Sequence, residues 1–213
     1  MNIRHRWFAH APIAGCAALL TASANATVPP PPTTYTLARP ARGAGGMSIA
    51  IHRDGTREAI ELSRAHGWHS HTWFDFAAHK QYASDSNAPG PCSVIDYSPD
   101  GPPELLDPVP GAFAMAAQIP ADAPRGGKET LGGVTTRIIE MPGGGKVWLD
   151  EARHLAMKVE VAMEGSPTPQ TLLDLTGIRF EKPAAASLTP PANCTHIAGD
   201  ANAHGGHAEV PMH

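Results

Sequence analysis

The sequence predicts a mainly β protein, folded as an antiparallel meander with one short helix and one long Pro/Gly-rich loop. The first observation is alternation, which is clearest where apolar residues occupy every second position from Leu155 to Met163. A period of two is typical of a strand with one buried face and one face in water. The second observation is that tight, glycine-bearing turns join several such runs, which favours antiparallel pairing. The third is that strands and helices do not alternate, which excludes a parallel nucleotide-binding sheet.

The chain is predicted to divide into four segments. After a signal peptide at residues 1–26, residues 27–46 hold four consecutive prolines and several glycines, which favour an extended linker. Within this linker we expect at most one short edge strand, at residues 33–37. The β domain is expected over residues 47–194. The remaining residues, 195–213, form a tail of small residues and histidines that is expected to be disordered.

Inside the β domain, short turns are expected to join neighbouring strands. The Asp54-Gly55 dipeptide tolerates a positive φ and predicts the turn of the first hairpin. Residues 98–128 are expected to form the long Pro/Gly-rich loop, and residues 113–118 within it the one short helix. The expected strands lie at residues 47–51, 60–62, 72–76, 81–84, 92–97, 134–141, 146–150, 155–163 and 171–180.

The N-terminus has the features of a secretory signal. Arg4 and Arg6 precede a short apolar run, and the Ala-Asn-Ala sequence that ends at Ala26 is a small-x-small cleavage site. The apolar run is too short to cross a membrane as a mature helix. Cleavage after Ala26 is therefore predicted, and it places the mature protein in the periplasm or outside the cell.

An alternative lies inside the same segment, because Ile13 to Cys16 resembles the motif at which bacterial lipoproteins are lipidated. Lipidation would make Cys16 the first residue and anchor the protein to a membrane as a lipoprotein. The stretch before Cys16 carries His10 and Pro12 and is weakly hydrophobic, whereas the stretch after it is the most apolar. This order favours cleavage after Ala26 over a lipid anchor.

The net charge of the mature chain narrows the classes of molecule that the protein is expected to bind. Once Arg4 and Arg6 leave with the signal, 14 basic and 20 acidic residues remain, a net charge of −6. A mildly acidic chain without a basic cluster is a poor candidate for binding nucleic acid or an anionic membrane surface. No later stretch is long and apolar enough for a transmembrane span. Neither nucleic acid nor a transmembrane location is therefore expected.

Cysteine usage fits an oxidising compartment. Cys92 and Cys194 are the two cysteines that remain in the mature chain, and an even count in an exported protein predicts a disulfide. This bridge would tie the end of the β domain to a strand in its middle.

No catalytic set is recognised, so the protein is predicted not to be an enzyme and to need no cofactor. The chain lacks the Gly-x-Ser-x-Gly sequence of many hydrolases, and neither mature cysteine is expected to be free. Residues 143–146 are typical of a hairpin turn, because they lack the rest of a phosphate-binding loop. The acids Glu58, Glu61, Asp75 and Asp96 fall on predicted strands, where sequence alone does not pair them.

Four local features, taken in order, carry a family resemblance. They are the Arg53-Asp54-Gly55 hairpin, the aromatic strand that turns between Asp75 and Lys80, the strand Lys146–Asp150 feeding Leu155–Lys158, and the final strand followed by Leu188–Pro191 and Cys194. Over residues 35–194, this order resembles the lipoprotein-carrier-like (LolA/LolB-like) half-barrel families of the bacterial envelope, including uncharacterised members.

The resemblance implies a curved antiparallel sheet, or half-barrel, whose concave face holds acyl chains or another apolar ligand. The lipoprotein carriers cover that face with several helices, whereas this chain offers only the short helix at residues 113–118. The loop at residues 98–128, a ligand or a partner is then expected to fill the hollow. The expected function is that of an exported, non-enzymatic envelope protein that binds an apolar, lipid-like molecule or an envelope protein.

A metal-binding protein of the periplasm is the alternative. His69 and His71 are two residues apart and would share one face of a strand, a usual geometry for two imidazoles on one zinc or copper ion, and His66 lies nearby. His204 and His207 stand among glycine and alanine in the tail, where flexible histidines can take up metal loosely. Solvated histidines are the simpler interpretation of both clusters.

The aromatic residues are expected to pack the core, with a ligand-facing subset as the alternative. They are Trp68, Trp73, Phe74, Phe76 and Trp148.

Overall fold

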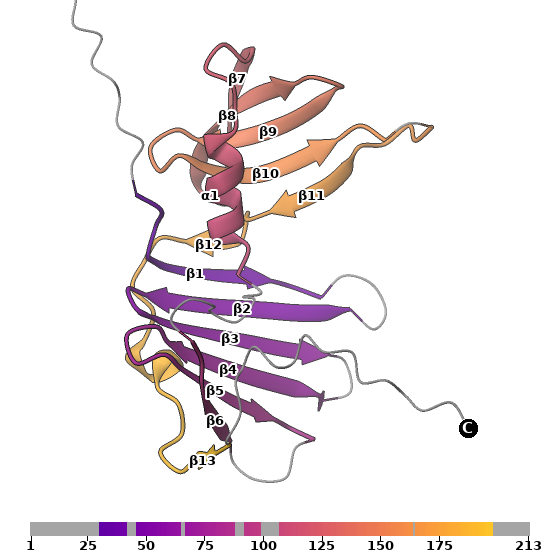
Figure 1. The fold of residues 1–213 in the computed structure, drawn as a ribbon. Helices are drawn as coiled ribbons and strands as arrows, with labels where there is room; N and C mark the ends of the chain where they lie inside the picture. The colour runs from indigo at the N-terminus through magenta and orange to yellow at the C-terminus, as the bar shows by residue number, and fades with distance from the viewer. Residues whose placement is uncertain are drawn as a thin grey trace, which may run out of the picture.

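The computed structural model describes residues 30–41, 46–64, 67–87, 92–98, 107–163 and 165–197. Over these residues the chain forms two sheets and one α-helix, and the sheets are not closed into a barrel (Figure 1). The mainly β, antiparallel fold predicted from the alternating pattern is confirmed.

The first sheet contains eight strands. Their bounds are β1 (Thr34–Arg39), β2 (Met47–Asp54), β3 (Arg57–Arg64), β4 (His69–Asp75), β5 (Lys80–Asp85), β6 (Ser93–Asp96), β12 (Ile178–Arg179) and β13 (Thr195–His196). Their order across the sheet is β12-β1-β2-β3-β4-β5-β6-β13. Neighbours pair antiparallel except for β6 and β13, which run parallel.

The second sheet contains five antiparallel strands in the order β11-β10-β9-β8-β7. Their bounds are β7 (Arg125–Leu131), β8 (Val134–Met141), β9 (Gly145–Asp150), β10 (Leu155–Val161) and β11 (Gln170–Asp174). The helix α1 (Val109–Ala117) precedes β7, and a single 3₁₀ turn, η2 (Ala185–Leu188), follows β12.

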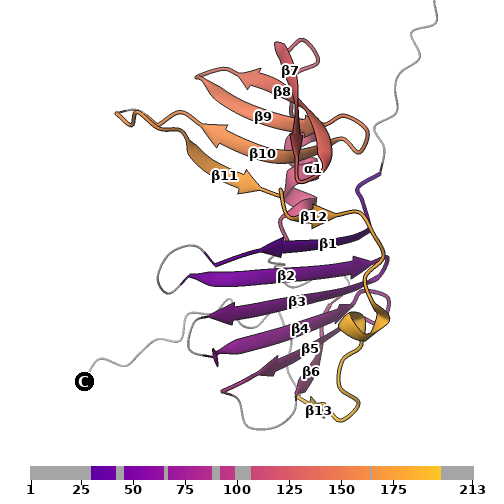
Figure 2. The same ribbon diagram turned by 180° about the vertical axis from the view of Figure 1, so that it is seen from behind.

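Thr176 and Gly177 join the two sheets. The chain leaves β11 in the second sheet, turns at these residues and enters β12 in the first, so the second sheet continues beyond β12 in Figures 1 and 2. The single strand predicted over residues 171–180 is therefore two strands. The backbone passes so close to β1 that a Cβ on Gly177 would collide with the carbonyl oxygen of Ala38. Glycine is required for the sheets to meet in this way.

Helix α1 covers one face of the second sheet, which we call the inner face, and its N-terminal end reaches the junction with the first sheet. It stands in front of β9 and β10 in Figure 1 and behind them in Figure 2. Its buried residues are Val109, Ala112 and Ala116. They belong to one core cluster with side chains of both sheets, among them Leu37 of β1 and Met157 of β10. This shared core packs the helix and the two sheets into one unit.

β1 lies inside the segment predicted as a linker, and it is an interior strand rather than an edge strand. It pairs with β12 on one side and with β2 on the other. Tyr35 and Leu37 alternate with half-buried threonines and are almost fully buried, so β1 has the same one-faced pattern as the later strands. The proline run ends at Pro32, before the ladder begins, and so does not interrupt it.

The Pro/Gly-rich loop predicted over residues 98–128 is shorter than expected. Helix α1 begins at Val109 rather than at residue 113, because Pro110 fits the first turn of a helix and Asp107 accepts a hydrogen bond from the Val109 N–H. β7 takes the end of the loop, where a polar and mostly exposed sequence pairs with β8 through its backbone. Residues 99–106 lie outside the described residues.

The predicted disulfide between Cys92 and Cys194 is confirmed. The two Cα atoms lie 4.6 Å apart, and 102 residues separate the cysteines in the sequence. Each cysteine directly precedes one of the two parallel strands β6 and β13, and Thr195 donates its N–H to the Cys92 carbonyl. The bridge therefore fixes β13 to the edge of the first sheet.

The core prediction holds for part of the aromatic set. Trp73, Phe74 and Trp148 are buried. Trp68 and Phe76 are half-buried. Phe76 still packs against the core cluster.

Several predictions lie outside the described residues. They concern the cleavage site at Ala26, the alternative lipid anchor at Cys16, and the histidines His66, His204 and His207. Among the residues that are described, α1 is nine residues long, and no helix there has the length and apolar character that a membrane crossing requires.

Candidate functional site

An apolar groove of about 530 Å³ lies beside the C-terminal end of α1, over the inner face of the second sheet. Met115 and Ile119 line it from the helix and the residues that follow, and Val147, Val159 and Leu172 line it from the sheet. The volume falls within the range of about 300–1,000 Å³ that is usual for small-molecule sites.

An irregularity in the sheet shapes this groove. The pairing of β10 with β11 shifts after Val159, which faces Leu173, whereas Glu160 faces Thr171. Leu172 therefore has no residue opposite it on β10, and its side chain is 57% exposed. A β-bulge of this kind re-aims a side chain, and bulges are frequent next to functional sites.

Exposed apolar side chains gather at the groove. Four large apolar side chains are exposed among the described residues, and Met115 and Leu172 line the groove itself. Met163, which is 48% exposed, directly follows the lining residue Ala162. The fourth, Ile197, lies beyond β13 in the first sheet. A cluster of exposed apolar groups marks a binding surface, whereas a single one does not.

The groove is poor in charge. Gln118 and Glu160 are the polar residues that line it. The Glu160 carboxylate is ion-paired, with its Oε1 atom 2.6 Å from Lys158 Nζ. The lining thus suits an apolar chain rather than an ionic ligand.

The rest of the inner face near α1 is filled by the protein itself. The buried residues Val109, Ala112 and Ala116 pack there against both sheets. The hollow that was expected to await a loop, a ligand or a partner is therefore occupied by α1 near the junction of the sheets. The apolar groove is the part that remains open beyond the end of the helix.

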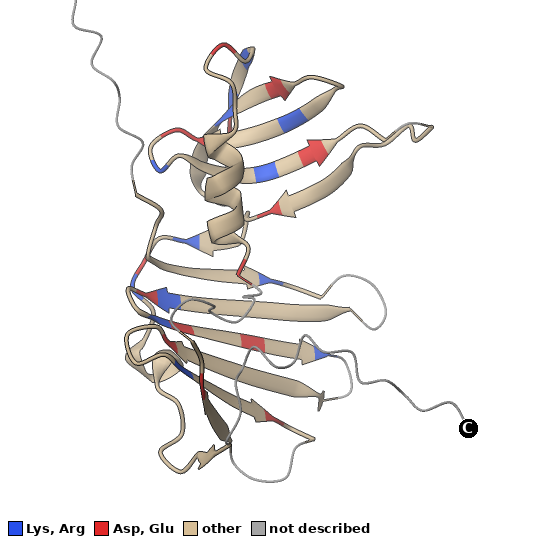
Figure 3. Cartoon of the chain, viewed as in Figure 1, with Lys and Arg blue, Asp and Glu red and all other residues tan. Residues whose placement is uncertain are grey.

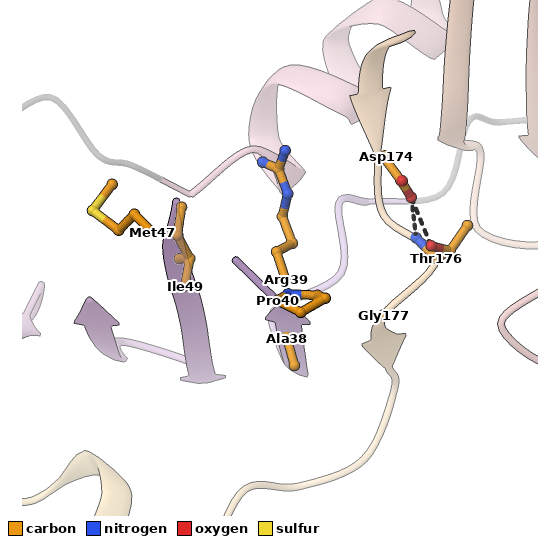
Figure 4. A pocket seen from close by; sticks show the side chains of 8 residues that line it. All are labelled: Ala38, Arg39, Pro40, Met47, Ile49, Asp174, Thr176 and Gly177. Atoms are coloured by element: carbon orange, nitrogen blue, oxygen red, sulfur yellow. Dashed lines mark hydrogen bonds between the residues drawn. The ribbon is translucent and has the colours of Figure 1, made fainter. Parts of the chain in front are cut away.

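A second opening, of about 330 Å³, lies where the two sheets meet. Figure 4 shows the side chains of Met47 and Ile49 on one side of it and Asp174 and Thr176 on the other. Thr176 donates both its N–H and its hydroxyl to Asp174 Oδ1, at 3.0 and 2.6 Å. With Arg39 also in its lining, this opening is smaller and more polar than the apolar groove.

Charged residues of both signs are interspersed over both sheets, as Figure 3 shows.

A buried polar cluster lies where α1 meets the first sheet. The side chains of Glu58 and Asp107 are fully buried. Tyr35 donates its hydroxyl to Asp107 Oδ2, and Arg53 donates to Glu58 Oε2 at 2.7 Å. Arg53 Nη1 also lies 3.9 Å from Asp107 Oδ2. Asp107 Oδ1 accepts the N–H of Val109, the first residue of α1, at 2.9 Å.

This cluster holds two carboxyl groups but only one guanidinium. Burial, and next the nearby Asp107, raise the pKa of Glu58 to about 8, although Arg53 opposes the change. Burial and the contact with Asp107 also raise the pKa of Tyr35, so this hydroxyl stays protonated. Glu58 consequently holds its proton near neutral pH. The sequence placed Glu58 on a strand but could not pair it with Asp107, which lies in the predicted loop.

Of the predicted histidine ligands, the structure describes only His69 and His71, and their polar contacts lie with different groups. His71 Nε2 lies 3.5 Å from Glu61 Oε1, and His52 Nε2 lies 3.8 Å from the same oxygen. The ring of His71 stacks on Trp73, and burial lowers the pKa of His71. His69, two residues away, instead has its Nδ1 atom 3.3 Å from the Gly67 carbonyl oxygen.

The described residues contain no group of three or more His, Cys, Asp or Glu side chains that could hold a metal ion. Local spacing in the sequence missed His52 and Glu61, because they reach His71 across neighbouring strands.

No protein-family model matches the sequence, and a comparison with curated proteins also finds no match. The resemblance to the lipoprotein-carrier-like families therefore stays a prediction. Function must be argued from the geometry of the site.

Proposed function

We propose that this chain is an exported, non-enzymatic protein of the cell envelope that binds an apolar, lipid-like ligand in the groove beside α1. The observation that carries the proposal is that the exposed side chains of Met115 and Leu172 line a groove whose remaining lining is also mainly apolar. Leaving these side chains in water is unfavourable, and an apolar ligand would cover them.

Two further features support the proposal. The groove offers no unpaired charge among its described lining residues, which favours a ligand whose bound part is neutral and apolar. The Cys92–Cys194 disulfide supports the location, since disulfides persist in the periplasm and outside the cell but are rare in the cytosol.

The test is a titration of the mature protein, from residue 27 onward, with the neutral apolar fluorophore N-phenyl-1-naphthylamine. Saturable binding is expected for the wild type, and a fatty acid should compete with the dye. The variant Leu172→Asp places a carboxylate in the groove and should weaken dye binding at least about tenfold, because burying a charge against apolar atoms is costly. Leu172 is exposed, so stability should change little.

Ile197→Asp is the matched control. Ile197 is 50% exposed, similar to Leu172, but lies away from the groove. This variant should bind the dye like the wild type. If the wild-type protein shows no saturable dye binding, the proposed apolar ligand is refuted. An envelope protein would then be the partner to test. Equal weakening by both substitutions would mean that the dye binds elsewhere.

A further inference from the structure

Helix α1 is held on the inner face by small side chains and by the partly buried Phe113. Its buried residues are one valine and two alanines, at positions 109, 112 and 116. Such side chains bury little apolar surface, so they contribute less to docking than leucine or phenylalanine would. The polar contacts at the start of the helix add to this apolar packing in fixing its position.

Those contacts tie the first residue of α1 to three strands. Asp107 accepts the Val109 N–H through one oxygen and the Tyr35 hydroxyl of β1 through the other. Arg53 of β2 lies within 3.9 Å of Asp107 and donates to Glu58 of β3. The helix is thus fastened to β1, β2 and β3 through one buried cluster.

The charge in this cluster balances only with a proton. Arg53 can neutralise one carboxylate, and a second ionised carboxylate would be buried without a counter-charge, which is costly. Glu58 Oε1 has no hydrogen-bond partner among the described residues, so it is the oxygen on which a proton fits. Asp107 before α1 and Arg53 from β2 act on the pKa of Glu58. Glu58 in turn acts on the pKa of Tyr35 from β1 and of Tyr97 after β6.

We infer that the Glu58–Asp107 pair is a proton-dependent latch that holds α1 on the inner face while one proton is bound and releases it when both carboxyls are ionised. The inference rests on the proposed function, because the residues that α1 brings to the groove, Met115 and those just after the helix, form one of its walls. Release of α1 would remove that wall and let the ligand leave.

The direction in which pH changes the docking of α1 depends on which state, docked or released, binds the Glu58 proton more tightly. The ordinary pKa of a glutamate is 4.5, whereas burial and the neighbouring Asp107, which directly precedes α1, raise the pKa of Glu58 to about 8. The docked state therefore binds the proton better, and docking is favoured at low pH. This advantage declines as the pH rises from 4.5 towards about 8 and is lost above it.

The decisive experiment is hydrogen exchange on the full mature protein at about pH 6 and about pH 9, expressed as protection factors that correct for the intrinsic rate. In the wild type, amides of residues 109–117 should lose protection about tenfold or more relative to those of β9 and β10 in the same sample. Glu58→Gln keeps the neutral form at every pH and should abolish this loss. The exposed Glu181→Gln is the matched control and should behave like the wild type.

Asp107→Asn removes the other charge and serves if Glu58→Gln fails to fold. The latch is overturned if, in the wild type, the protection factors of α1 change between these two pH values no more than those of β9 and β10. It is also overturned if Glu58→Gln or Asp107→Asn shows the same loss of α1 protection as the wild type. The same samples are titrated with N-phenyl-1-naphthylamine. Dye binding without any pH response of α1 leaves the proposed function standing and the latch refuted. A pH response of α1 without dye binding does the reverse.

Discussion

At the scale of single residues, two glycines are fixed by the approach of one backbone to another. A Cβ on Gly177 would collide with the carbonyl oxygen of Ala38, and one on Gly132 would collide with that of Thr176. Gly132 also has a φ of +57°, which side chains rarely adopt. Both contacts lie along the line where the second sheet joins the first.

The variant Gly177→Ala should lower the free energy of unfolding by about 2–4 kcal/mol, because β12 must move away from β1 to accept the methyl group. Urea denaturation measures the change. Gly127→Ala is the control, since a Cβ there meets no atom within 4 Å, and it should stay within about 0.5 kcal/mol of the wild type. Equal effects of the two substitutions would contradict the argument.

Particular residues also show which contacts of the candidate site could be predicted from the sequence and which could not. The cysteine pair was predictable, because its logic rests on count and compartment rather than on position. The pairing of Glu58 with Asp107 was not, since one residue lies on a strand and the other in a predicted loop. The same holds for His71 with His52 and Glu61, which meet only through the register of three strands.

At the scale of elements, a strand could be predicted from the sequence when buried side chains hold it in the sheet, but not when backbone pairing alone does. β10 was clear in the sequence because its alternating apolar face is buried in the core. β7 was missed because its residues are mostly exposed, and its place depends on backbone pairing with β8. The groove was missed for a related reason: the bulge that exposes Leu172 is a property of two paired strands.

Helix α1 gives a prediction of its own. Gly111 lies in the first turn of the helix on the exposed side, and a Cβ there meets no atom within 4 Å. Gly111→Ala should therefore stabilise the protein by about 0.5–1 kcal/mol, through the higher helix propensity of alanine. A rise in the urea midpoint without a change in slope is the expected result. A loss of stability would show that this face of α1 is in contact with something.

At the scale of the whole molecule, the disulfide closes the first sheet on the side away from the second. Replacing Cys92 and Cys194 by alanine should lower the free energy of unfolding by about 4 kcal/mol, because the unfolded chain regains the freedom of a long loop. Denaturation under non-reducing conditions measures this effect. The wild type in a reducing agent should match the double variant. A change below about 1 kcal/mol would mean that the bridge adds little to folding.

The position of β1 between β12 and β2 has a consequence for how the chain is made. β1 is synthesised early, and β2 follows it at once, whereas β12 appears only when most of the chain has left the ribosome. Pairings between segments that lie far apart in the sequence form slowly. The entropy of closing a long loop is lost before the contacts between the strands can stabilise the structure. The first sheet cannot be completed on a partly made chain. For a protein that we propose to be exported, this late closure would keep the chain open long enough to be threaded through a membrane pore.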